Sequence, residues 1–115
     1  MMEEGIMVTI KGKNIQMTKG DSASIEFTLY DGDDIYIAES GDSMRFAMKQ
    51  FYSDSSPLLI KNIDMSTMTL VINPEDTENL DAPCSYVYDV QVTFANGTID
   101  TVVPNGTLRL LEEVD

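Results

Sequence analysis

The chain has 115 residues, a length that suits one hydrophobic core, and we expect a single domain over residues 1–115. Its 20 acidic and 7 basic residues give a formal net charge of −13, which argues against nucleic acid and anionic membranes as partners. Histidine is absent and Cys84 is the only cysteine, so the commonest general base, the commonest transition-metal ligand and an intrachain disulfide are excluded.

The N-terminal residues do not resemble a signal peptide. They are acidic and lead to a short apolar run, whereas a signal peptide begins with a basic region and continues into a longer apolar one. No apolar segment reaches the length that a transmembrane helix needs. We therefore expect a soluble protein that is made in the cytoplasm.

Alternation of apolar and polar residues, the mark of a strand with one buried face, recurs along most of the chain. Short candidate strands at 6–10 and 14–17 come first, and a clear strand follows at 24–29 between turns at 19–21 and 31–34. Later segments repeat the period, and the longest begins at Tyr86, which we expect to open the central strand. The side chains expected to face the core are Ile25, Phe27, Leu29, Met44, Phe46, Met48, Met68, Leu70, Ile72, Tyr86, Tyr88, Val90, Val92 and Phe94.

Two Asn-Gly pairs punctuate the C-terminal third. Asn96-Gly97 predicts a two-residue hairpin of type I′, with a return strand at 98–103. The second pair, Asn105-Gly106, predicts a further turn that leads into a last strand at 107–114. Strands at this spacing, without helical stretches between them, are typical of an antiparallel sandwich or barrel.

One short helical turn is predicted near residues 74–80. Asn73 is a suitable N-cap, Pro74 fits the first helical position, and Leu80 is expected to pack under the sheet. A helical turn followed by a tyrosine is how the crossing between two sheets is built in immunoglobulin-like sandwiches, and either Tyr86 or Tyr88 suits that role. The fold class predicted is an all-β, antiparallel immunoglobulin-like β-sandwich.

Asp31, Asp33 and Asp34 bring three carboxylates into one loop, which is the oxygen-rich kind of segment that calcium binds. The EF-hand pattern requires a glutamate at the last position of a twelve-residue loop, and that position is Asp42. We interpret the segment as a polar turn, with a cation site as the alternative. Cys84 is interpreted as a buried inert thiol, with intermolecular pairing as the alternative.

The acidic pairs Glu75-Asp76 and Glu112-Glu113 are better explained by helix capping and surface charge than by acid and base catalysis. No serine, cysteine or threonine has a histidine to activate it, and no glycine-rich phosphate loop is present. We therefore predict no catalytic residues, no cofactor and no metal site, and a protein that is not an enzyme.

The order and spacing of several short segments resemble the immunoglobulin-like N-terminal domain of phage baseplate upper proteins, a family encoded by tailed phages and prophages of Gram-positive bacteria. The resemblance covers residues 18 to 114, although 82–85 lack the glycine that is usual in the family. The matching segments are Lys19-Gly20-Asp21 with Ile25-Glu26-Phe27-Thr28-Leu29, Gly41-Asp42 with Met44-Arg45-Phe46, Leu59-Ile60-Lys61, Pro74-Glu75-Asp76-Thr77, Tyr86-Val87-Tyr88-Asp89-Val90-Gln91-Val92, Asn96-Gly97 and Leu110-Leu111-Glu112-Glu113-Val114.

This resemblance implies a virion component, made in the bacterial cytoplasm, that performs no reaction and docks onto other phage tail or baseplate proteins. A homo-oligomer is an alternative partner. Edge strands and loops are expected to make the contacts. A calcium-dependent or carbohydrate-binding module is the alternative, although the absence of tryptophan counts against sugar stacking. An enzyme would need a deep pocket with paired carboxylates of perturbed pKa.

Overall fold

The computed structural model describes residues 8–9 and 14–113. Of the candidate strand at 6–10 it therefore describes only 8–9, and residue 114 of the last predicted strand lies outside it. The elements are β1 (Val8–Thr9), β2 (Asn14–Thr18), β3 (Ala23–Glu26), β4 (Tyr30–Asp31), β5 (Asp34–Ile35), β6 (Ser43–Lys49), β7 (Leu59–Ile63), β8 (Thr69–Ile72), α1 (Pro74–Thr77), β9 (Cys84–Thr93) and β10 (Ile99–Leu111).

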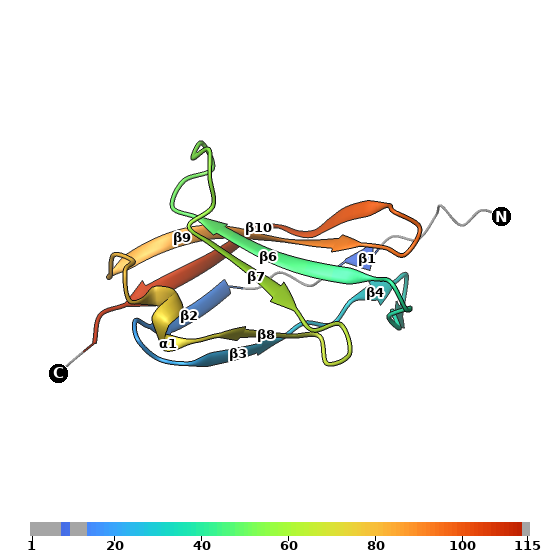
Figure 1. Cartoon of the computed structure of the whole chain (residues 1–115), viewed down its shortest axis with the longest axis horizontal. Helices are drawn as coiled ribbons and strands as arrows, with labels where there is room; N and C mark the ends of the chain where they lie inside the picture. The colour runs from blue at the N-terminus through green and yellow to red at the C-terminus, as the bar shows by residue number, and fades with distance from the viewer. Residues whose placement is uncertain (1–7, 10–13, 114–115) are drawn as a thin grey trace.

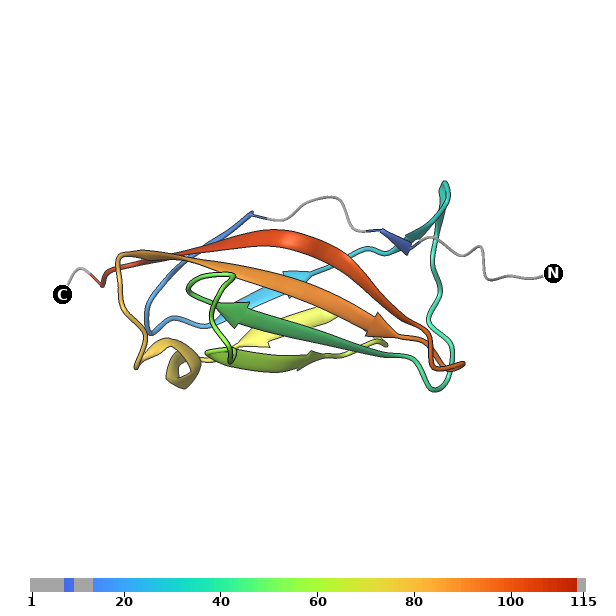
Figure 2. The same ribbon diagram turned by 90° about the horizontal axis from the view of Figure 1, so that it is seen from above.

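The strands form two packed layers, as Figures 1 and 2 show. A five-stranded sheet with the order β2-β10-β9-β6-β7 covers a two-stranded sheet of β3 and β8, and a small third sheet has the order β1-β4-β5. The chain passes from β8 to β9 through α1, so the layers are joined by a helical corner. This arrangement is an immunoglobulin-like β-sandwich, as the strand pattern predicted.

One strand pair departs from the predicted antiparallel arrangement. β2 runs parallel to β10, with Ile15 opposite Leu108, whereas every other pair of strands among the described residues is antiparallel. The direction of β2 is set by the turn at 19–20, which carries the chain into β3 of the opposite layer. A strand that enters the other layer is not constrained by a hairpin to oppose its neighbour.

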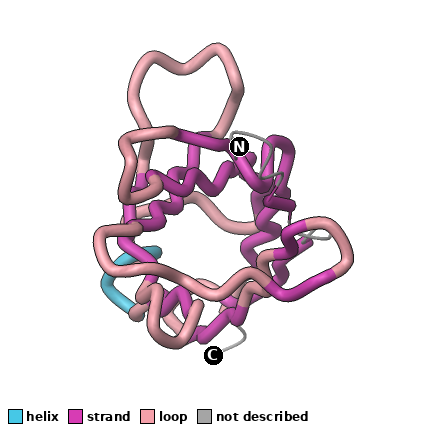
Figure 3. Tube along the Cα trace, turned by 90° about the vertical axis from the view of Figure 1, so that its right-hand side faces the viewer, coloured by secondary structure: helices cyan, strands magenta, loops and turns pink. Residues whose placement is uncertain are grey.

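The apolar phase of the strands fills the space between the layers, which Figure 3 views from one end. In β6 and β9 the buried side chains alternate with partly exposed ones, as predicted, and β9 is the middle strand of the large sheet. The core comprises Ile15, Met17, Phe27, Leu29, Met44, Phe46, Met48, Ile63, Leu70, Ile72, Tyr86, Tyr88, Val90, Val92, Val102, Val103, Leu108 and Leu110.

Three of the predicted core residues are only partly buried. Ile25 lies in β3, but Met68 and Phe94 lie just outside the strands to which the alternation assigned them. Met68 occupies the turn before β8 with φ 55°, and Phe94 follows the end of β9. The alternation thus extends beyond the ends of the strands. It does so after β3 as well, because β3 ends at Glu26 whereas the strand predicted at 24–29 included Phe27 and Leu29, which are nevertheless buried.

The Asn96-Gly97 hairpin forms, but its turn differs from the predicted type. The Phe94 N–H donates to the Thr98 carbonyl and the Gly97 N–H donates to the Phe94 carbonyl, both at 2.8 Å. Gly97 has φ 92°, whereas Asn96 does not have a positive φ. These bonds close a three-residue loop of the kind built from a type I turn and a glycine, instead of the type I′ turn, in which both central residues have positive φ.

The second Asn-Gly pair does not make a turn. β10 continues from Ile99 to Leu111, and its register against β9 shifts twice, between Thr101 and Val103 and between Val103 and Gly106. The predicted strands at 98–103 and 107–114 are therefore one strand with a bulge. A side chain at position 106 would overlap the ring of Tyr88, which lies opposite in β9, so the glycine serves close packing.

The corner around α1 has the predicted form. Pro74 opens the helix after the cap residue Asn73, and Leu80 packs partly buried against the core. Tyr86, and not Tyr88, is the corner tyrosine, because its hydroxyl donates to the Asp81 carbonyl at 2.7 Å. This bond ties the start of β9 to the end of the corner.

Candidate functional site

The three aspartates of the 31–34 segment do not converge. Asp31 and Asp34 are directly opposite each other in the hairpin of β4 and β5, and Asp33 lies in its turn. All three are exposed. Across residues 8–9 and 14–113, no three histidine, cysteine, aspartate or glutamate side chains gather as a metal site would require. The segment is a polar hairpin turn.

Of the two acidic pairs noted in the sequence, one residue makes structural hydrogen bonds and the others are exposed to solvent. Asp76 Oδ2 accepts a hydrogen bond from Lys61 Nζ at 2.8 Å and another from the Asn73 N–H at 2.8 Å. Partial burial disfavours the charged carboxylate, but these bonds and the charge of Lys61 outweigh that effect and lower the pKa of Asp76. Glu75 is exposed, as are Glu112 and Glu113 beyond the end of β10.

A second carboxylate, that of Asp42, links the loops at one end of the sandwich by hydrogen bonds. Its oxygens accept hydrogen bonds from the Tyr36 hydroxyl at 2.6 Å, the Glu39 N–H at 2.9 Å and the Ala95 N–H at 2.8 Å. Partial burial opposes ionisation, but the three bonds prevail and lower the pKa of Asp42. Burial and the bond to Asp42 raise the pKa of Tyr36.

These two carboxylates make the stability of the fold decrease at acidic pH. Because the pKa of Asp42 and of Asp76 is lower in the folded state, each contributes stability above the unfolded pKa of about 3.9 and loses it as the pH falls through the folded pKa. We expect the free energy of unfolding to fall below about pH 4, and Asp42→Asn to make that fall less steep. Urea unfolding from neutral to acidic pH measures both. The matched control is Asp33→Asn in the exposed turn, and equal slopes for the two variants would contradict the assignment.

The outer face of the five-stranded sheet, which faces away from β3 and β8, differs in charge from the rest of the molecule. The charged side chains that its strands direct outward are Arg45 and Lys49 from β6, Arg109 from β10 and Asp89 from β9. Three cations therefore accompany one carboxylate, although the chain as a whole has a net charge of −13. A face of this kind avoids the repulsion that the acidic remainder would exert on an acidic neighbour.

The hairpin loop between β6 and β7, residues 50–58, projects from this face (Figures 1 and 3). Its turn is closed by Asp54, whose N–H donates to the Phe51 carbonyl at 3.1 Å while its Oδ2 accepts from the Phe51 N–H at 3.0 Å. Farther along the sheet, the Tyr52 hydroxyl donates to Asn105 Oδ1 at the bulge of β10, at 3.2 Å. The loop is thus fastened over the sheet on the side of β9 and β10.

Exposed apolar side chains concentrate on and beside this loop. Of the eight large apolar side chains that are exposed in the described part of the chain, four lie within residues 51–60. We call these four the hairpin patch: Phe51, Tyr52, Leu58 and Ile60, which are 50% to 61% exposed. The other four are distributed over three separate segments. An apolar concentration on one face is a feature of surfaces that bind other proteins.

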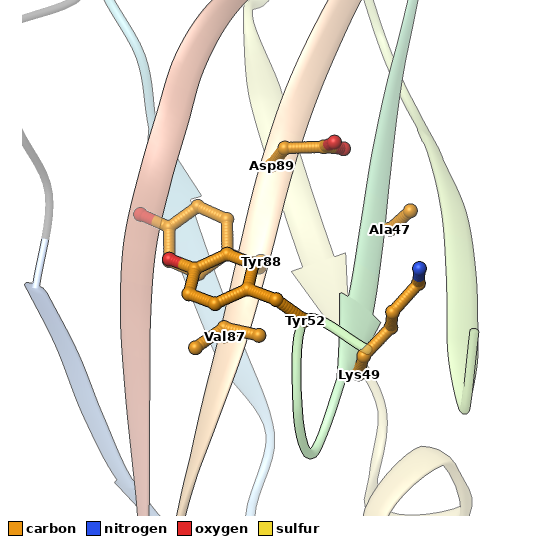
Figure 4. A pocket seen from close by; sticks show the side chains of 6 residues that line it. All are labelled: Ala47, Lys49, Tyr52, Val87, Tyr88 and Asp89. Atoms are coloured by element: carbon orange, nitrogen blue, oxygen red, sulfur yellow. The ribbon is translucent and has the colours of Figure 1, made fainter. Parts of the chain in front are cut away.

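A pocket of about 110 Å³ lies between the loop and the sheet, as Figure 4 shows. It is lined by Ala47, Lys49, Tyr52, Val87, Tyr88 and Asp89. Ile60 of the hairpin patch is paired with Ala47, so the patch and the pocket adjoin. Burial raises the pKa of Tyr88 to about 12, which keeps this hydroxyl protonated at neutral pH.

Asp89 contributes the carboxylate of this pocket. Its Oδ1 is shielded from solvent and has no hydrogen-bond partner among the residues that the structure describes. The neighbouring cations are engaged elsewhere, because Arg45 donates to Gln91 Oε1 at 2.8 Å and Lys49 Nζ donates to the Asp54 carbonyl at 2.8 Å. Sequence reasoning placed Asp89 on the outward phase of β9 but had no signal for its isolation.

Nothing in the sequence singled out the hairpin patch. Phe51 and Tyr52 are adjacent and precede a polar turn, so their exposure depends on how the loop leaves the sheet. The expectation that edge strands and loops make the contacts with partner proteins stays a prediction.

Cys84, interpreted as buried, is only partly buried at the start of β9. Among the described residues, no helix has the length and apolar character needed to cross a membrane.

No family model matches this chain, and no curated protein matches it. Among solved structures, the chain is similar to murine CRIg, with 13% sequence identity and a TM-score of 0.46. The similarity covers 94% of this chain and 99% of the murine one.

Proposed function

We propose that this chain is a non-catalytic assembly module of a phage or prophage tail or baseplate, and that it binds neighbouring virion proteins through the outer face of the five-stranded sheet. The observation that carries the binding role is the hairpin patch, where four exposed apolar side chains adjoin a face that is less acidic than the rest of the chain. The phage context comes from the sequence resemblance over residues 18 to 114.

The energetics favour the outer face over the backbone edge of β7. At this edge of the large sheet, β7 directs Lys61 inward, where it pairs with Asp76 at 2.8 Å. An inward-pointing charge on an edge strand discourages the addition of another strand. Apolar side chains that project from the face can instead be covered by a partner without breaking this pair, and such a core of buried apolar contacts is what gives protein interfaces their affinity.

Substitution of one patch residue tests this role. We expect Ile60→Glu to reduce binding of a tail or baseplate partner at least tenfold, because a buried, unpaired carboxylate is costly at an interface. The chain would be coexpressed with the proteins encoded beside its gene, and the copurified protein would be identified and quantified. The matched control is Val71→Glu, since Val71 is also an exposed strand residue (44%, against 52% for Ile60) but lies on β8 in the other sheet.

Two results would contradict the proposal. One is that no tail or baseplate protein copurifies with the unmodified chain. The other is that Val71→Glu weakens binding as much as Ile60→Glu, because the partner would then not distinguish the two layers. Thermal unfolding of both variants verifies that each retains the fold before binding is compared.

A further inference from the structure

The pocket beside the hairpin patch has the size of one side chain. Its volume of about 110 Å³ is well below the 300–1,000 Å³ that is usual for small-molecule and cofactor sites. A space of this size holds several water molecules, or the polar end of one side chain. The volume therefore favours a single polar side-chain end over a sugar ring or a nucleotide.

The chemistry of the pocket favours a cation. Asp89 Oδ1 has no partner in the described part of the chain, and both nearby basic residues donate to other acceptors. A shielded carboxylate oxygen without a partner is costly, and a group that supplies a charge-assisted hydrogen bond removes that cost. Because the terminal torsion of an aspartate is soft, either oxygen can turn toward an incoming donor.

The aromatic ring of Tyr52 in the pocket favours a guanidinium over an ammonium group. Tyr52 lines the pocket opposite the sheet, is 61% exposed and is held at its hydroxyl by Asn105. A guanidinium stacks on such a ring and donates two parallel bonds to a carboxylate, whereas an ammonium is more strongly hydrated and acts as a point charge. The ammonium of Lys49 also lines the pocket and limits the affinity for any free cation.

We propose that this pocket receives an arginine side chain of the partner protein, with its guanidinium paired to Asp89 and stacked on Tyr52. The proposal depends on the proposed function for the source of the arginine, but the pocket itself can be tested without a partner. An arginine seated here would lie beside the hairpin patch, which would place a charged anchor next to an apolar one. Such a combination is typical of the residues that dominate binding energy at interfaces.

The test uses Nα-acetylargininamide as the probe and its neutral isostere Nα-acetylcitrullinamide as the control ligand. Backbone amide shifts of the ¹⁵N-labelled chain would be followed as each is added at millimolar concentration. We expect saturable shifts around Asp89 and Tyr52 with the arginine probe, and none with the citrulline probe. Asp89→Asn should weaken arginine binding at least tenfold, whereas Asp33→Asn, which removes an exposed carboxylate in another hairpin, should not change it.

Three outcomes would overturn the proposal: equal shifts from both probes, unchanged binding in Asp89→Asn, and a lower melting temperature in Asp89→Asn. The last would mean that Lys49 leaves the Asp54 carbonyl and pairs with Asp89 in solution. A shielded carboxylate oxygen without a partner contributes no stability, so the expected melting temperature of Asp89→Asn is equal or higher. Failure of the probe would leave the copurification result intact, and failure of copurification would leave the probe result intact.

Discussion

Replacing Gly106 with alanine is expected to lower the free energy of unfolding by about 3 kcal/mol, at the upper end of the usual cost of overpacking a core. The added Cβ would overlap the ring of Tyr88, which is 2% exposed. That ring cannot withdraw easily, because its centroid lies 5.0 Å from that of Phe46 on the adjacent strand. Urea unfolding at neutral pH measures the change.

Gly32→Ala provides the control for a glycine substitution without overpacking. Gly32 has φ 66°, and no atom lies within 4 Å of the position that an added Cβ would take, so alanine there incurs only the backbone cost of about 1 kcal/mol. The double variant Gly106→Ala with Tyr88→Leu should lose less free energy of unfolding than the two single variants lose in sum, because leucine leaves room for the added Cβ. Equal effects at positions 32 and 106, or strict additivity, would contradict the packing explanation.

The second large effect is expected for Tyr86→Phe, which should lower the free energy of unfolding by about 1–2 kcal/mol. The substitution removes the hydroxyl that donates to the Asp81 carbonyl at 2.7 Å, and so loosens the corner that joins the two layers. Burial, with Cys84 and Asp81 nearby, raises the pKa of Tyr86 to about 12. The hydroxyl is therefore protonated and able to donate at neutral pH.

Tyr52→Phe is the matched control for this loss of a hydroxyl. Tyr52 is 61% exposed and its bond to Asn105 is longer, at 3.2 Å, so its removal should change stability by less than about 0.5 kcal/mol. Urea unfolding of both variants under the same conditions gives the comparison. If Tyr86→Phe is no more destabilising than Tyr52→Phe, the corner bond does not hold the layers together.

The strands could be predicted because burial on one face forces a period of two. Met44, Phe46 and Met48 are at most 2% exposed, as their spacing required. The helical corner could also be predicted, since the residues of a cap and a first turn are local in sequence. What decided between Tyr86 and Tyr88 was the reach of the hydroxyl to Asp81, which depends on how the corner folds back.

Local sequence signals gave the wrong structure where contacts with residues distant in the sequence determine the local conformation. Asn105-Gly106 has the composition of a turn, but β10 continues through it with a bulge, and the glycine leaves the space that the ring of Tyr88 fills. The isolation of Asp89 has a similar origin. Arg45 and Lys49 were both available in principle, and each bonds to an acceptor that only the folded loop and sheet bring near.

The measurement that most directly tests a docking role for the outer face is hydrogen exchange of the chain alone and in its complex with the copurified tail or baseplate protein. Central strands exchange slowly even in the free chain, so the informative amides are those of the loop at 50–58 and the edge strand β7. We expect slower exchange in both segments on binding, with β3 and β8 unchanged. Protection that appears instead on β3 and β8, and leaves residues 50–63 unaffected, would contradict the account.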